Sequence, residues 1–376
     1  MVEPKRRRDS SVAQVAAHYE QSPMPNLFIV GAMKAATTTR ADQLGAHSEI
    51  FAPVQKEPNL FAELDECGRP YYRLVAPKLG SSEPGPISRT PSITAEEYRD
   101  LYRGSEAYRY RLDASTNYLP TPCSAKLIRR VAPDAKIIIL LRNPYDRAYS
   151  SFAYQLSRGR EAVSRFEAAV QAELSGERDE WAHAWRHIHT SCYDDAVARF
   201  QNEFAPEQVK VLLFNDFISE PRAVNDEIAS FLSISKMAEV PRLASNETSI
   251  PKTRAAAAIK GVLSYGPLRR KMRRALPQRV QRTAKRVVDA NLAWIDSRGE
   301  RPSRPTEQAL KRLAEVFEPE ISKLESRLQR DLSRWRLASA PLDDRLAMRA
   351  RPAVPAASSA EERSMRSRAK ALRRRP

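Results

Sequence analysis

Short apolar runs alternate with amphipathic segments along most of the chain. Residues 27–30, 136–141 and 208–214 have the length and aliphatic composition of buried strands, and residues 109–112 are compatible with a shorter one. A helical segment over residues 36–46 follows the first strand. This alternation predicts an α/β fold of three layers, in which helices cover both faces of a mainly parallel sheet. The pattern does not indicate the order of the strands.

The last apolar pattern predicts a long amphipathic helix. Large apolar residues recur at steps of three and four from Leu310 onward, and we expect the helix to end near Trp335. Residues 1–24 and 343–376 lack such a pattern and are expected to be disordered extensions. A single domain over residues 25–342 is therefore the simplest organisation.

The net charge of +17 is concentrated in three segments. Residues 1–8, 269–286 and 345–376 carry charges of +3, +9 and +8, which leaves the rest of the chain close to neutral. A nucleic-acid-binding face spread over the whole fold is therefore not expected. Within a basic helical segment over residues 267–288, the run 269–286 could contact an anionic membrane or a polyanionic acceptor, although a simple solvated face is an equally good interpretation.

Cysteine and histidine usage favours a reducing compartment without a metal site. Cys67, Cys123 and Cys192 form no CxxC pair, and the basic N-terminus is not followed by the apolar run of a secretory signal. The longest aliphatic run has five residues, too few for a membrane-spanning helix. His183 and His187 have the spacing of two metal ligands on one helix, but no further ligand completes a site. We therefore predict a cytoplasmic protein without a metal ion, and a polar helix face at these histidines.

The first predicted strand leads into the sequence GAMKAATT and then into a helix. Such a strand–turn–helix directs unpaired amide groups and the positive end of the helix dipole at one point. Lys34 and the hydroxyls of Thr37 and Thr38 would complete a cradle for an anion. The spacing differs from the G-x-x-x-x-G-K-[ST] loop of phosphoryl transferases. Taken alone, a lysine and threonines in an ordinary surface turn explain the segment equally well. The full cradle would comprise Gly31, Lys34, Ala35, Ala36, Thr37 and Thr38.

A second polar motif, RNPYDRAYS, follows the strand at residues 136–141. The strand ends at the sheet edge where α/β proteins bind ligands, so Arg142 is placed to meet an anion there. Ser150 lies two helical turns further on and can reach the same group. An ion pair of Arg142 with Asp146 and a solvated serine is the alternative interpretation.

Taken together, the two motifs resemble the nucleotide-binding segments of PAPS-dependent sulfotransferases, in the same order and each after a strand. PAPS is 3′-phosphoadenosine 5′-phosphosulfate, and its product PAP lacks the sulfuryl group. The segments KEPNLF (56–61) and DASTNY (113–118) are similar to those of the branch that includes heparan-type and many bacterial sulfotransferases. The resemblance extends over residues 26–336 and implies a P-loop-like fold.

The resemblance also implies roles for individual residues. Lys34 and the loop amides would stabilise charge on the departing 5′-phosphate, and Arg142 with Ser150 would hold the 3′-phosphate. Glu57 is the candidate general base that removes the proton of the acceptor, provided that partial burial raises its pKa. Further contacts with the nucleotide are expected from Tyr193, Lys252 and Arg254.

Two departures from the family pattern affect the expected site. Ala36 stands where the family usually has a glycine, and a positive φ there would cost alanine about 1 kcal/mol. Ala114 replaces a lysine, so an auxiliary catalytic lysine is missing at that position. A fold that has lost catalysis therefore stays open as an alternative.

Two other functions compete with sulfuryl transfer. A kinase or other phosphoryl transferase would also cradle phosphate, but the GK[ST] loop and a magnesium-binding carboxylate after a strand are missing from the sequence. A basic adaptor for nucleic acid would use the charged tails. The acceptor is expected to be a hydroxyl or amine of a glycan, glycolipid or glycosylated natural product, by analogy alone. A homodimer would be compatible with the sequence.

Overall fold

The computed structural model describes the central part of the chain in several stretches. It does not describe Lys252, Arg254 or the basic segment 269–286, and it describes only residues 23 and 24 of the two predicted extensions. The described residues are 23–62, 75–77, 84–86, 93–158, 160–237 and 305–337.

The centre of the fold is a parallel sheet of five strands in the order β2-β5-β1-β6-β7. Every residue of β1 is buried, as are the last five of β6, which explains their uninterrupted apolar sequences. The predicted strands are confirmed, and the shorter one, expected over residues 109–112, begins at Tyr110. The two-residue strand β2 was not predicted, and it pairs with β5. The strands are β1 (Leu27–Gly31), β2 (Ile50–Phe51), β5 (Tyr110–Ala114), β6 (Lys136–Leu141) and β7 (Val209–Leu213), and a separate antiparallel pair is formed by β3 (Val75–Pro77) and β4 (Pro84–Pro86).

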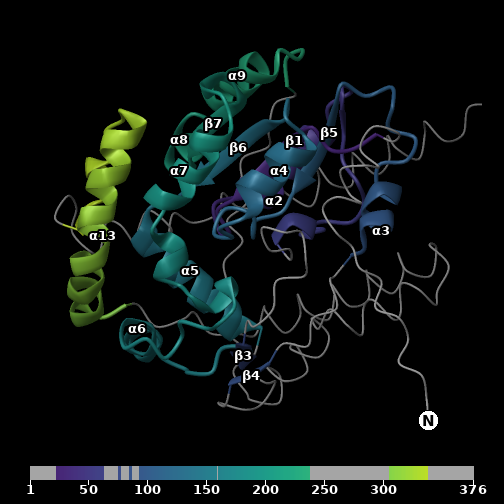
Figure 1. The fold of residues 1–376 in the computed structure, drawn as a ribbon. Helices are drawn as coiled ribbons and strands as arrows, with labels where there is room; N and C mark the ends of the chain where they lie inside the picture. The colour runs from purple at the N-terminus through teal and green to yellow at the C-terminus, as the bar shows by residue number, and fades with distance from the viewer. Residues whose placement is uncertain are drawn as a thin grey trace, which may run out of the picture.

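Helices cover both faces of the sheet, as predicted (Figure 1). In the strand order, the connection from β1 to β2 leads toward the β2 edge of the sheet. The connections from β5 to β6 and from β6 to β7 lead toward the β7 edge. Because such crossovers are right-handed, α2 lies on one face and α4 with α7 on the other. Arg40 of α2 donates to Asn225 of α9, which brings α9 to the α2 face. These helices are α2 (Thr37–Gly45), α4 (Ser124–Val131), α7 (Asp194–Glu203), α8 (Phe214–Ser219) and α9 (Pro221–Leu232).

The long helix α13 (Glu307–Leu328) packs beside α7, α5 and α6 at one side of the molecule (Figure 1). It ends seven residues before the predicted end, because Gln329 adopts a left-handed conformation with a φ of 50°. Trp335 is nevertheless buried, in a short 3₁₀ turn, where its carbonyl accepts a hydrogen bond from Asn143. The remaining helices are α3 (Ala95–Asp100), α5 (Pro144–Ser157), α6 (Phe166–Leu174) and the 3₁₀ turns Leu60–Ala62, His183–Trp185, His189–Ser191, Pro206–Gln208 and Ser333–Trp335.

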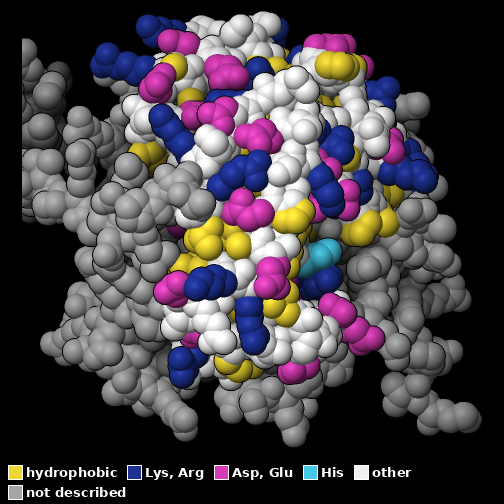
Figure 2. Space-filling model, turned by 90° about the vertical axis from the view of Figure 1, so that its left-hand side faces the viewer, with side chains coloured by type: hydrophobic (Ala, Val, Ile, Leu, Met, Phe, Trp, Pro, Cys, Tyr) yellow, Lys and Arg dark blue, Asp and Glu magenta, His cyan; other side chains and the backbone are white. Residues whose placement is uncertain are grey.

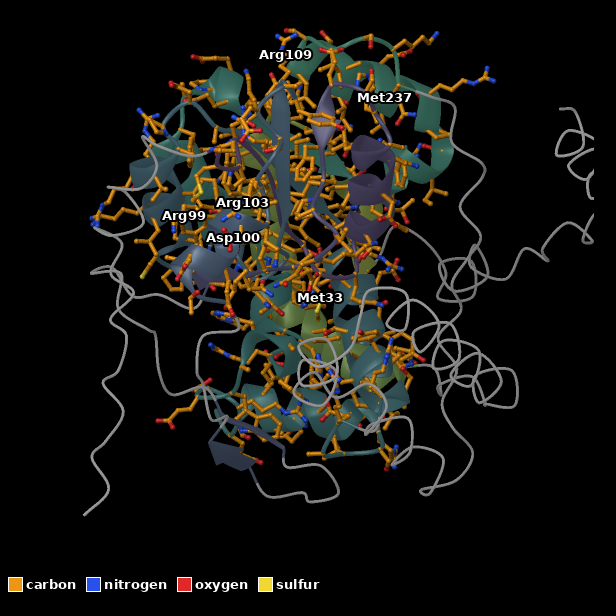
Figure 3. The ribbon with its side chains drawn as sticks, turned by 90° about the vertical axis from the view of Figure 1, so that its right-hand side faces the viewer. Met33, Arg99, Asp100, Arg103, Arg109 and Met237 are labelled. Atoms are coloured by element: carbon orange, nitrogen blue, oxygen red, sulfur yellow. The ribbon has the colours of Figure 1, made fainter. Side chains whose placement is uncertain are left out.

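The carboxyl ends of the parallel strands converge at one edge of the sheet. Met33, just after β1, and Arg109, just before β5, are labelled at opposite ends of the sheet in Figure 3. The loops that follow β1, β2, β5 and β6 therefore meet at the edge marked by Met33. None of the described helices is both long enough and apolar enough to span a membrane.

Candidate active site

The loop after β1 has the geometry of an anion-binding turn. A side chain at Gly31 would place a Cβ 2.6 Å from Cβ of Leu119, so only glycine fits there. Lys34 and Ala36 both adopt left-handed conformations, with φ values of 73° and 63°. Ala36 caps α2 without a side-chain hydrogen bond, and the first turn of α2 contains no acidic residue. The amide groups of this turn are therefore available to an anionic ligand.

Lys34 lies in a strongly cationic environment. Desolvation, together with the charges of Arg142, Arg158 and Arg147, lowers its pKa to about 8. Its ammonium lies 4.4 Å from the ring centroid of Tyr154 and forms no ion pair with a carboxylate within the described residues. An anion bound here would relieve this repulsion.

Arg142 lies directly against the same loop. Its Nη1 donates to the carbonyl of Lys34 at 2.9 Å, and its guanidinium carbon lies 4.6 Å from the ring centroid of Phe214. The residue is only 9% exposed, and its Nε is buried with no hydrogen-bond partner in the described part of the chain. Burial lowers the pKa of this guanidinium, and the charge of Asp146 opposes the effect. A buried cation with an unused donor fits a bound phosphate.

Glu57 lies in the loop that connects β2 to the 3₁₀ turn at Leu60–Ala62. The residue as a whole is exposed, but its carboxylate turns inward and accepts a hydrogen bond from Oγ1 of Thr116 at 2.9 Å. Desolvation raises the pKa of Glu57, the Thr116 hydroxyl lowers it, and the charge of Asp113 raises it further. The carboxyl group is therefore more basic than that of an ordinary glutamate.

A buried network holds the Glu57 loop against the end of β5. Asp113 is fully buried and accepts hydrogen bonds from the hydroxyls of Tyr98, Tyr118 and Ser115. Oγ of Ser115 in turn accepts a hydrogen bond from the amide of Asn59 at 3.1 Å. The position of the loop therefore depends on a carboxylate that does not itself reach the surface.

Left-handed backbone conformations are concentrated in these two loops. Among the described residues, six other than glycine have a positive φ. Two of them, Ser233 and Gln329, terminate helices, where this conformation is common. The other four are Lys34, Ala36, Glu57 and Asn59. Backbone strain of this kind is typical of functional sites.

The structure describes most of the other predicted site residues. Thr37 is buried and Thr38 exposed in the first turn of α2, Ala35 is buried in the loop, and Ser150 is partly exposed on α5. Tyr193 is buried, and its hydroxyl donates to the carbonyl of Arg142 at 2.9 Å, so it orients the Arg142 backbone. Its contact with a nucleotide stays a prediction. Lys252 and Arg254 lie outside the described residues.

The structure adds residues that sequence reasoning missed. Arg147 is almost fully buried and donates to the carbonyls of Met33 and His187, which ties the loop after β1 to the segment before α7. It stood inside the RNPYDRAYS motif, but nothing in the sequence distinguished it from a solvated arginine. Thr116, which contacts Glu57, stood inside the DASTNY segment without a role of its own, and Tyr154, which contacts Lys34, gave no signal.

The predicted polar helix face at His183 and His187 is wrong. His183 lies in a 3₁₀ turn that ends at Trp185, so no helix joins the two histidines. His187 is buried, with its ring nitrogens 3.1 Å from Oγ of Ser151 and 3.0 Å from Oε2 of Glu161. Within the described stretches, no group of three His, Cys, Asp or Glu side chains is arranged to hold a metal ion.

Comparisons with known proteins identify the family. A model of the sulfotransferase family matches residues 25–239, more than half of the chain. This chain belongs to the sulfotransferase family. A solved sulfotransferase from Alicyclobacillus acidocaldarius is 25% identical and has a TM-score of 0.56, with 83% of this chain and 99% of that chain covered. The sulfotransferase fold predicted from the sequence is thereby confirmed.

Curated relatives of this sulfotransferase act on carbohydrate according to their names. Carbohydrate sulfotransferase 15 of Mus musculus is 21% identical over 257 residues, 59% of this chain and 46% of the relative. A bifunctional heparan sulfate N-deacetylase/N-sulfotransferase 1 of Xenopus laevis is 26% identical over 213 residues, 56% of this chain and 22% of the relative. The chain thus spans less than half the length of these relatives.

Proposed function

We propose that this sulfotransferase transfers a sulfuryl group from PAPS to a hydroxyl or amine of a sugar-bearing acceptor and releases PAP. The observation that carries the proposal is the cationic loop, where the buried Arg142 donates to the carbonyl of Lys34 and the charge of Arg142 helps to lower the pKa of Lys34. Family membership supports PAPS as the donor. The carbohydrate and heparan sulfate relatives support a glycan, glycolipid or glycosylated natural product as the acceptor.

The two cationic residues have separate tasks in this proposal. PAPS supplies a sulfuryl group bonded to its 5′-phosphate, and negative charge grows on that phosphate as the bond breaks. Lys34, the free amides at the start of α2 and the hydroxyls of Thr37 and Thr38 stabilise this charge. Arg142 and Ser150 hold the 3′-phosphate, which distinguishes PAPS from nucleotides without that group.

Glu57 has the complementary task of accepting a proton. Its raised pKa makes the carboxylate a stronger base than an ordinary glutamate, and the Thr116 hydroxyl fixes one of its oxygens. The second oxygen is left to accept the proton of the acceptor as the acceptor oxygen or nitrogen attacks sulfur. The proton moves to Glu57, and the electrons of the broken bond go to the 5′-phosphate.

Calorimetric titration of PAP tests the nucleotide site directly. Wild-type protein is expected to bind PAP and to discriminate against AMP and ATP, because neither carries the 3′-phosphate. Arg142→Ala and Lys34→Ala should each weaken binding at least tenfold, since each removes a charged hydrogen-bonding partner. Arg130→Ala is the matched control, because it removes an equal charge from an exposed position on α4.

The outcome separates the proposal from its competitors. Loss of PAP affinity in the Arg142 and Lys34 variants, with Arg130→Ala unchanged, would support the site. Folded wild-type protein that does not bind PAP would overturn the proposal, and magnesium-dependent binding of ATP in its place would favour a phosphoryl transferase.

A further inference from the structure

A cavity of about 420 Å³ opens beside the anion-binding loop. It lies between the loop after β1, the segment after β5, the turns before α7, and α13. Among the described residues assigned to the nucleotide, Tyr193 alone lines the cavity, and neither Lys34 nor Arg142 does. Its volume falls within the range of about 300–1,000 Å³ that small-molecule pockets occupy.

The cavity is lined by a neighbour of each group that the proposed reaction uses. Met33, which precedes Lys34, lines one wall and is labelled in Figure 3 at the loop edge of the sheet. Thr116 lines another wall and donates its hydrogen bond to Glu57. The cavity therefore adjoins a side chain that contacts the proposed base, Glu57, and the residue that precedes the proposed phosphate-binding Lys34.

The walls combine apolar surface with neutral polar groups. Leu119, Pro120 and Val316 line the cavity with apolar side chains. Asn117 and Thr190 also line it, with the Asn117 amide nitrogen bonded to Asn59 and the Thr190 hydroxyl bonded to Arg147 and to the carbonyl of Arg186. This mixture suits a ring that has apolar faces and hydroxyl groups at its edges.

His189 adds another uncharged group to the wall. Desolvation and the charges of Arg186 and Arg199 lower its pKa to about 4. The imidazole is therefore neutral at pH 7, where it can donate one hydrogen bond and accept another.

The two arginines on the wall are held by hydrogen bonds to neutral oxygens of the protein, although Nε of Arg199 is buried without a partner among the described residues. Arg147 donates to the carbonyls of Met33 and His187 and to the hydroxyl of Ser191. Arg199 donates to the carbonyl of Leu119, and the charge of Asp195 acts on it.

Carboxylates, in contrast, stand at the rim. Asp195, Glu315 and Glu320 all line the cavity, and Glu320 forms an ion pair with Lys323. Figure 2 shows acidic and basic side chains intermixed over the face that carries α13, without a patch of one sign. A sulfated or carboxylated chain would meet three carboxylates against two arginines among the described lining residues, so the lining carries no excess of positive charge.

We propose that this cavity holds the acceptor, and that the part bound there is an uncharged, hydroxyl-bearing ring such as a neutral sugar unit, not a stretch of polyanionic glycan. The inference rests on the proposed sulfuryl transfer and narrows its acceptor. It also separates this chain from the heparan sulfate relative, whose name specifies a polyanionic substrate.

Matched acceptors that differ only in charge test the proposal. Transfer from labelled PAPS would be measured to the nitrophenyl β-glycosides of glucose, galactose and N-acetylglucosamine, to the glucuronide, and to the polymer heparosan. We expect at least one neutral glycoside to be sulfated with a kcat/KM at least tenfold above that of the glucuronide, because the glucuronide brings a carboxylate to an acidic rim.

Two pairs of variants link this preference to the cavity. Val316→Trp should fill the cavity and reduce transfer at least tenfold, while Ser326→Trp, exposed elsewhere on α13, should not.

Glu315→Lys should raise the ratio of glucuronide to glucoside transfer about three- to tenfold, since it replaces a repulsive charge with an attractive one. Glu307→Lys makes the same charge change away from the cavity and should leave the ratio unchanged.

PAP binding, measured on every variant, separates the two proposals. Loss of PAP binding by the wild-type protein would overturn the sulfuryl transfer itself. Protein that binds PAP but sulfates only heparosan or the glucuronide, or none of the neutral glycosides, would overturn the neutral acceptor. Unimpaired transfer by Val316→Trp would show that the acceptor binds elsewhere.

Discussion

Single residues in the site are held in states that cost the protein stability. Lys34 is a cation among cations, and Ala36 has a conformation that alanine seldom adopts. Neither the buried charge of Lys34 nor the backbone conformation of Ala36 stabilises the unliganded protein. Together they direct a positive charge and the amide groups at the start of α2 toward the proposed phosphate site. From the sequence, Ala36 is expected to carry a cost on the condition that its φ is positive, and its φ of 63° meets that condition.

Ala36→Gly should stabilise the protein. Glycine adopts a positive φ without the steric penalty of a Cβ, and we expect the free energy of unfolding to rise by about 0.5–1 kcal/mol. Thermal or denaturant unfolding measures the change. Ala35→Gly is the control, because Ala35 is buried in the same loop without a positive φ and should become less stable. Equal destabilisation by both substitutions would contradict the strain at Ala36.

Lys34→Met should also stabilise the unliganded protein at pH 7, while reducing transfer about 10²-fold or more. The folded-state pKa of Lys34, about 8, lies below its ordinary value of 10.5. Holding the charged form in the fold therefore costs on the order of 1–3 kcal/mol below pH 8, and this cost disappears as pH rises from 8 toward 10.5. Unfolding at pH 7 and pH 9.5 should show the advantage of Lys34→Met shrinking. An advantage that stays constant across this range would disprove the depressed pKa.

At the scale of elements, the site depends on how short segments attach to the sheet. The strands β1 and β6 could be predicted because burial on both faces gives them continuous apolar sequences. The attachment of the Glu57 loop could not, since it rests on the two-residue strand β2 and on the hydroxyl of Ser115. Hydrogen bonds between segments far apart in sequence leave no periodic pattern, so the roles of Ser115 and Arg147 emerge only from the structure.

Ser115→Ala should release the Glu57 loop. The substitution leaves the amide of Asn59 and one oxygen of buried Asp113 without their partner, which should cost about 1–2 kcal/mol of stability. We expect kcat to fall about tenfold with the Kd for PAP unchanged, because the nucleotide cradle is built from other loops.

Tyr98→Phe is the control for a purely structural effect. It removes another hydroxyl from Asp113, one that donates to Oδ2 and not to Oδ1, the oxygen to which Ser115 donates. The variant should lose comparable stability and keep its kcat. If both variants lose kcat equally, the Ser115–Asn59 hydrogen bond has no particular role in positioning Glu57.

At the scale of the whole molecule, the parallel topology brings together loops that are distant in the chain. The sequence motifs indicated an α/β sheet and a nucleotide edge, and the fold and the family are confirmed. The sequence did not indicate the strand order, the early end of α13 or the cavity. The cavity needs four separate segments, and α13 contributes to it from beyond residue 305. The set of residues that line the cavity is therefore determined by tertiary packing, which cannot be predicted from local sequence patterns.

The joint arrangement of Glu57 and Lys34 predicts a bell-shaped dependence of rate on pH. With PAPS limiting, kcat/KM should rise as Glu57 loses its proton, above the ordinary glutamate pKa of 4.5, and should fall near pH 8 as free Lys34 loses its own. Saturating PAPS should move the descending limb to higher pH, because a bound anion favours the protonated lysine.

Glu57→Gln should abolish the ascending limb, and Lys34→Arg, which stays charged, should remove the limb near pH 8. A descending limb that persists unchanged in Lys34→Arg would assign it to another group and remove Lys34 from the chemical step.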